Sequence, residues 1–165
     1  MLPRNRHLQA VTVAGALVFL AACGKSGSSA AGNPTSTTPK VTTTAPHGPP
    51  DIKIGVTKFG PTLVDSTGRT LYEWDSDPDG QSTCQEMCAS LWPPLAIKGK
   101  TIVVGPGLDQ SKFKPIFLPH GATGVVMDGR ALYHFVNDVK PGQVIGQDFG
   151  GGVWHAIHPN GLPVG

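Results

Sequence analysis

A duplicated segment constrains the fold of this chain more than any other feature. Residues 68–77 and residues 129–138 both fit the pattern Gly-Arg-x-Leu-Tyr-x-aromatic-x-x-Asp, and Trp92 and Trp154 follow the two copies in nearly the same register. The repeat period is about 61 residues, which is long enough for one supersecondary unit per copy. The sequence therefore predicts a domain of two homologous units, repeat one at about 56–97 and repeat two at about 120–160.

Short alternating segments and turn residues predict that each unit is built from β-hairpins. The chain has 22 glycines and 16 prolines, which argues against long helices. The Asp128-Gly129 dipeptide suits a two-residue hairpin turn with positive φ. The expected strands are 52–58, 61–64, 69–74, 101–104, 124–127, 130–136 and 152–157. One helical turn is expected at 84–91, before Pro93-Pro94. The predicted fold class is mostly β with one short helix near the two cysteines.

The N-terminus has the pattern of an export signal. Arg4 and Arg6 precede a short apolar segment at 11–20, which is too short to span a membrane comfortably. The segment ends in Leu20-Ala21-Ala22-Cys23, which resembles the lipobox of bacterial lipoproteins. That resemblance implies a signal peptide at 1–22 and acyl chains such as palmitate on Cys23, with the domain outside the cytoplasm. The alternative is an ordinary cleaved signal peptide.

Residues 23–50 have the composition of a disordered tether. They are nearly all Gly, Ser, Ala, Thr and Pro, and they cannot bury enough apolar surface to offset their ordering entropy. Residues 51–165 remain for the folded domain. Once Arg4 and Arg6 leave with the signal, 11 basic residues face 11 acidic ones. This balance gives no electrostatic case for nucleic-acid binding.

The two copies resemble a known family of predicted bacterial lipoproteins. That family is built from a secreted repeat with a Tyr-x-(Phe/Trp/Tyr)-x-x-Asp motif, which stands here as Tyr72, Trp74 and Asp77 and again as Tyr133, Phe135 and Asp138. The resemblance covers essentially the whole domain and implies its architecture and its export, but no activity. From the residues themselves we expect a structural role, because paired aromatics of a strand are usually core; an aromatic platform for a flat ligand is the alternative.

An acidic segment after the first motif matches the ligand spacing of a calcium loop. Asp75, Asp77, Asp79 and Glu86 stand at positions 1, 3, 5 and 12, with Gly80 at position 6. Pro78 lies inside the loop and the entering segment is a predicted strand, so a solvated acidic turn is the competing interpretation. The second repeat lacks the pattern.

Cys84 and Cys88 are the two cysteines left after lipidation of Cys23, and we expect a disulfide between them outside the cytoplasm. With the neighbouring Met87 they also match the soft ligands of exported copper carriers. A copper site would need a histidine brought from elsewhere in the fold. The candidates are His120, His134, His155 and His158.

The function expected from these features is that of a lipid-anchored, non-catalytic binding or structural module of the bacterial cell envelope. Its expected partners are the membrane, through the lipid, and an envelope protein or small ligand. The alternative is a metal-handling or redox protein that uses calcium, copper or the cysteine pair. No assembled nucleophile and base, nucleotide loop or metalloprotease motif is present in the sequence, so catalysis is not expected.

Overall fold

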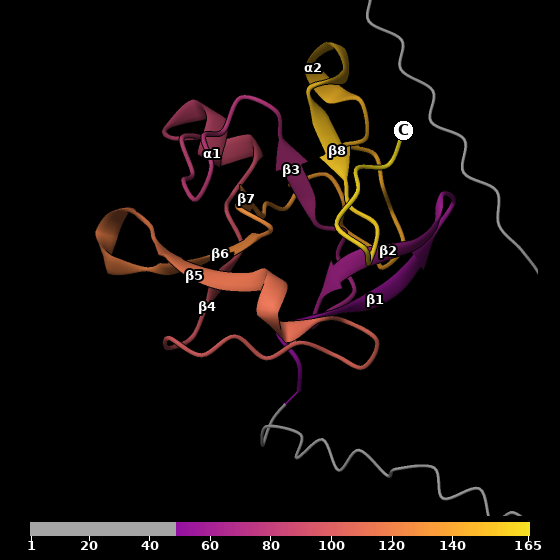
Figure 1. Ribbon diagram of the computed structural model, residues 1–165. Coiled ribbons are helices and arrows are strands. Elements are labelled where there is room, and N and C mark those ends of the chain that lie inside the picture. Colours follow the sequence, from indigo (N-terminus) through magenta and orange to yellow (C-terminus); the bar gives the residue numbers. More distant parts are fainter. Residues whose placement is uncertain (1–48) are drawn as a thin grey trace, which may run out of the picture. The chain divides into compact units, whose positions relative to one another are not determined.

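Each repeat contributes a β-hairpin, a short inner strand, a helical turn and a closing strand. The computed structural model describes residues 49–165. Repeat one contains β1 (Ile52–Thr57), β2 (Gly60–Asp65), β3 (Tyr72–Trp74), α1 (Met87–Leu91) and β4 (Ala96–Ile97). A 3-10 turn, η1 (Gln110–Lys112), leads into repeat two, which contains β5 (Phe113–Phe117), η2 (Pro119–Gly121), β6 (Thr123–Met127), β7 (Arg130–Ala131), α2 (Phe149–Gly152) and β8 (Trp154–Ala156). Figure 1 shows the β1–β2 and β5–β6 hairpins on opposite sides of this domain.

The closing strand of each repeat pairs with the other repeat. β4 of repeat one lies antiparallel to β6 of repeat two, and β8 of repeat two lies antiparallel to β3 of repeat one. Between them Tyr72 and Tyr133 exchange backbone hydrogen bonds of 3.0 and 2.9 Å. Neither repeat therefore completes its own sheet, and the two units fold as one interlocked body.

Alternation along the inner strands separates two cores. Side chains of neighbouring strand residues point to opposite faces, so Tyr72 and Tyr133 enter an aromatic cluster while Leu71 and Leu132 enter an aliphatic one. In the aromatic cluster the rings of Trp92 and Trp154 stack with centroids 3.9 Å apart and planes 2° apart. Trp74 stacks on the outer side of Trp154, and Phe135 packs on the outer side of Trp92.

The predicted fold class, mostly β with two homologous repeats and a short helix at the cysteines, is confirmed. Asp128 and Gly129 have the positive φ values, 48° and 86°, that the hairpin turn requires. Several boundaries differ from the prediction. β2 pairs along its whole length with β1. Residues 69–71 lie in an expected strand, but they contact β2 only around the Val64–Thr70 bridge and through the Arg69 amide, which donates to the Asp65 carboxylate.

Two further expected elements are shorter or missing. Residues 101–104 form no strand beyond a bridge between Val104 and Ile52, and the strand expected at 130–136 is limited to Arg130–Ala131. The helix begins at Met87, not at residue 84, because Ser82 is held by Tyr133 of the other repeat and Thr83 is held by Asp77. Pairing between repeats, which local patterns do not contain, decides these boundaries.

Candidate functional site

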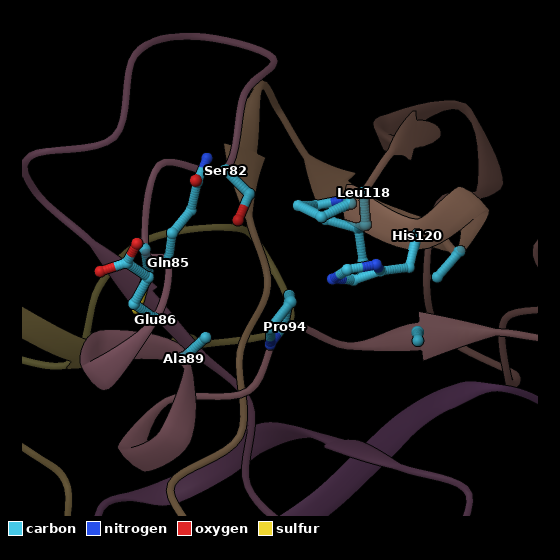
Figure 2. Close-up of a pocket in the computed structure, with 11 residues that line it drawn as sticks. Ser82, Gln85, Glu86, Ala89, Pro94, Leu118 and His120 are labelled. Carbon is cyan, nitrogen blue, oxygen red and sulfur yellow. The ribbon is translucent and has the colours of Figure 1, made fainter.

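A cavity of about 410 Å³ lies beside the Cys84–Cys88 disulfide. The segment before and within α1 forms one wall, and the turn between β5 and β6 forms the other (Figure 2). Pro94 lies between the two walls. The residues that line the cavity are Ser82, Cys84, Gln85, Glu86, Ala89, Pro94, Ala96, Leu118, Pro119, His120 and Ala122.

The repeat motif fixes the first wall. The Asp77 carboxylate accepts hydrogen bonds from the Thr83 amide at 2.8 Å and from the Thr83 hydroxyl at 2.7 Å. Its other oxygen accepts a hydrogen bond from the hydroxyl of Tyr133, which also lies 2.8 Å from the Ser82 hydroxyl. Cys84 is buried and closes the wall through its disulfide to Cys88. A residue of repeat two thereby positions the cavity wall contributed by repeat one.

The second wall is a tight turn. Pro119 starts η2, His120 has a φ of 62°, and the Leu118 amide donates to the Ala122 carbonyl at 2.9 Å. Leu118 is buried against Gly124, where an added Cβ would approach the leucine side chain to within 2.8 Å. The His120 side chain is exposed, and Figure 2 shows its ring on the cavity side of the turn.

The lining is chiefly apolar with a few polar groups. Alanine, proline and leucine side chains provide most of its surface, and Ser82, Gln85, Glu86 and His120 provide its hydrogen-bonding groups. No lysine or arginine lines it. A concave apolar surface of this size with a few polar groups is typical of sites for small molecules.

A second polar group lies on the β3–β8 pair. Glu73 and His155 are register partners, and Arg130 Nε is 3.8 Å from Glu73 Oε2. Burial raises the pKa of Glu73, while Arg130 opposes the shift. His155 Nε2 is 3.4 Å from Asp75, and its buried Nδ1 has no hydrogen-bond partner. These charged and polar side chains lie close to one another around the β3–β8 pair.

The predicted calcium ligands are used in other contacts. Asp77 is buried and hydrogen bonded to Thr83 and Tyr133, whereas Asp75 lies near Arg130 and His155. Asp79 lies at a different cavity, beside Gly129, and Glu86 lies at the disulfide. Within residues 49–165 no three His, Cys, Asp or Glu side chains are grouped so as to hold a metal ion. Calcium and copper binding stay predictions.

The structure brings together the cysteine pair and one of the four histidines named from the sequence. Cys84 and Cys88 have Cα atoms 5.2 Å apart and form the expected disulfide. His120 lines the cavity with Cys84, while His134 contacts Asp65, His155 contacts Asp75 and His158 contacts the Pro61 carbonyl. Cys23 and most of the expected tether lie outside the described residues.

The six motif residues form structure and present no ligand platform. Tyr72, Asp77, Tyr133, Phe135 and Asp138 are each at most 4% exposed, and Trp74 is half-buried within the aromatic stack. The sequence analysis gave no role to the arginine of the repeated pattern. Arg69 donates to the carbonyls of Phe135 and Asp138, and Arg130 donates to those of Trp74 and Asp77. Its presence in both copies was the signal that could have identified it.

Comparison with known proteins places the chain in a family. A family model described as a secreted repeat of unknown function matches residues 53–96 and 119–158, which together are just over half of the chain. The chain belongs to this family of secreted repeats. Each matched segment covers most of one repeat, although the second begins after β5. No curated protein and no solved structure matches the chain. Residues 49–165 include no helix of the length and apolar character needed to cross a membrane.

Proposed function

We propose that this protein is a lipid-anchored, non-catalytic binding module of the bacterial cell envelope, and that the cavity beside Cys84–Cys88 is its binding site. The proposal rests on the observation that the motif residues and the cavity have different roles. The tyrosines and aspartates of the motif form hydrogen bonds that hold the two repeats together. The cavity is concave, largely apolar and positioned by those hydrogen bonds.

The lining supports a small neutral molecule with an apolar body and one or two hydrogen-bonding groups. The apolar wall favours burial of a hydrocarbon or aromatic part. The rim supplies a hydroxyl, an amide, a carboxylate and an imidazole, and it supplies no lysine or arginine to neutralise a phosphate or sulfate. The expected partner is therefore a neutral envelope molecule and not an anion or a nucleic acid.

Benzyl alcohol is a suitable probe of the cavity, because it joins one aromatic ring to one hydroxyl. In an amide NMR titration of the exported protein we expect shifts concentrated at residues 82–89 and 118–122. Ala89→Trp should fill the cavity and abolish them. Ser90→Trp, on the exposed side of the same helix, is the matched control and should keep them. Shifts elsewhere, or shifts that persist in Ala89→Trp, would contradict the proposed site.

The anchor is tested separately at Cys23. In a bacterial host the chain should partition with membranes and incorporate labelled palmitate. Cys23→Ser should remove the label and release the protein from detergent-soluble membrane fractions, or leave it unprocessed. Incorporation of palmitate into Cys23→Ser, or none into the unaltered chain, would contradict lipid anchoring without affecting the proposed cavity.

A further inference from the structure

We propose that the Cys84–Cys88 disulfide is a site of thiol–disulfide exchange, opened and closed by an exported dithiol protein. The inference goes beyond the proposed binding function, and it rests on three observations. The equivalent segment of repeat two forms without a disulfide, a strained residue lies inside the ring that the bond closes, and the two cysteines differ in exposure.

Repeat two provides an internal comparison for the bond. Glu86 precedes α1 and Asp148 precedes α2, and each accepts the same backbone hydrogen bond, from Ser90 and from Gly152, at 3.0 Å. Gly146 and Gly150 occupy the positions that correspond to Cys84 and Cys88. Gly150 and Gly151 have φ values of 68° and 86°, so repeat two closes the equivalent turn with left-handed glycines and without a covalent link.

The ring closed by the disulfide contains a strained residue. Glu86 has φ 51° and ψ −116°, a region that side chains larger than glycine rarely occupy. Its counterpart Asp148 has φ 60° and ψ 16°, the ordinary left-handed region that aspartate tolerates. The strain is thus specific to the repeat that carries the bond, and opening the ring lets Glu86 relax. Relief of this strain favours the reduced pair.

The two cysteines are not equally exposed. Cys84 is 3% exposed and belongs to the aromatic core, whereas Cys88 is half-buried on a helix that contains no buried residue. A thiolate can therefore reach Cys88 first. Its sulfur bonds to Cys88 Sγ as the Cys84–Cys88 bond breaks, and Cys84 leaves as a thiolate that takes up a proton.

The second thiol of the same partner completes the exchange. It attacks the partner's own sulfur in the mixed disulfide and releases Cys88 as a thiolate, which is then protonated. The protein gains two electrons and two protons, and the partner dithiol becomes a disulfide. Cys84 lines the cavity, so on the proposed binding function the exchange also loosens one wall of the binding site.

In the test, the exported protein is equilibrated with mixtures of reduced and oxidised dithiothreitol. The samples are quenched with acid and alkylated, and peptide mapping then gives the reduced fraction of Cys84 and Cys88 separately from Cys23. Near-ultraviolet circular dichroism of the stacked tryptophans follows the fold. We expect the pair to become fully reduced while that signal is retained. A bond that stays closed until the tryptophan signal is lost would overturn the proposal, whatever the result of the benzyl alcohol titration.

Two glycine variants separate strain from a general loss of structure. Glu86→Gly removes the backbone strain of the closed form and should lower the equilibrium constant for reduction about tenfold. Asp148→Gly makes the matched change in repeat two and should leave that constant unchanged. Equal shifts in both variants, or none in Glu86→Gly, would overturn the role of strain. Trapping with glutathione should label Cys88; preferential labelling of Cys84 would overturn the assigned direction of attack.

Discussion

The hydroxyl of Tyr72 donates a hydrogen bond to the carboxylate of Asp138, which lies 66 residues further along the chain. The second copy of the motif returns the contact, because the Tyr133 hydroxyl donates to Asp77. The first and last residues of the Tyr-x-aromatic-x-x-Asp motif are thus partners across repeats and not within one. A motif of this kind needs two copies to be satisfied, which gives a physical reason for the duplication.

The Tyr72–Asp138 bond should be a large contribution to stability, because Asp138 is fully buried and only the Ile145 amide contacts its other oxygen. Tyr72→Phe removes the donor and leaves a buried carboxylate short of one partner, so we expect a loss of about 2 kcal/mol in the free energy of unfolding. Denaturant unfolding measures it. A double-mutant cycle with Asp138→Asn should give a coupling energy above about 0.5 kcal/mol; additive losses would contradict a direct bond.

Alkaline titration should detect the two hydrogen bonds between tyrosine and aspartate that join the repeats. Burial, followed by the hydrogen bond to a carboxylate, raises the pKa of both Tyr72 and Tyr133 well above the ordinary value. Because the folded pKa is raised, the stabilisation is complete below the unfolded value of about 10 and is lost as pH rises above it. These are the two tyrosines of the chain. We expect tyrosinate absorbance to appear together with unfolding; a simple titration near pH 10 in the folded protein would contradict it.

The sequence predicted the repeats, the turn and the disulfide because each depends on local or directly repeated residues. Asp128-Gly129 needs only its own backbone preferences, and Cys84 and Cys88 are close in the chain. The exchange of closing strands could not be predicted in this way. No residue in or near β4 indicates that its partner is β6 and not a strand of its own repeat. Tertiary pairing decided both the shortened strands and the origin of the helix at Met87.

The sequence analysis identified only part of the candidate site. The disulfide of the first wall was predicted from the spacing of its cysteines. Asp77 was named both as a motif residue and as a candidate calcium ligand, and its partners in the structure are Thr83 and Tyr133. The opposite wall at Leu118 and His120 carries no motif, because a cavity is formed by surfaces that meet only after folding. His120 was one of four histidines, and only the fold distinguishes it from the others.

Gly146 should tolerate no side chain, although it lies in an irregular segment. A Cβ there would lie 2.6 Å from the Trp92 ring and 3.0 Å from the Tyr72 ring. We expect Gly146→Ala to lower the free energy of unfolding by about 3 kcal/mol, because the stacked core cannot give way. Gly151→Ala is the matched control. It meets no atom within 4 Å but has a φ of 86°, and should cost only about 1 kcal/mol.

Removing the disulfide should weaken the domain only modestly. The closed ring is short, so a chain-entropy model gives a loss of about 2 kcal/mol for Cys84→Ala with Cys88→Ala. Relief at Glu86 reduces the loss further. Thermal unfolding should stay cooperative with a moderately lower midpoint and an unchanged near-ultraviolet signal. A variant that loses the tryptophan signal at room temperature would show that the bond is essential to the fold.

Asp65 should make the stability of the domain depend on acid pH. Burial alone would raise its pKa, but hydrogen bonds from His134, from the amide and hydroxyl of Thr67 and from the Arg69 amide outweigh burial and hold the pKa well below its usual range. Because the folded pKa is depressed, the stabilisation is complete above the unfolded value of about 3.9 and is lost as pH falls toward the folded value.

Replacing that carboxylate isolates its contribution. We expect Asp65→Asn to lower the free energy of unfolding by about 2 kcal/mol at pH 7, because an amide cannot accept all of these bonds at once. The difference from the unaltered chain should shrink as the pH is lowered below about 4, where the reference carboxyl begins to lose its advantage. Denaturant unfolding of both proteins between neutral and acid pH measures the two curves. Parallel curves would mean that the ionised carboxylate is not the source of the stabilisation.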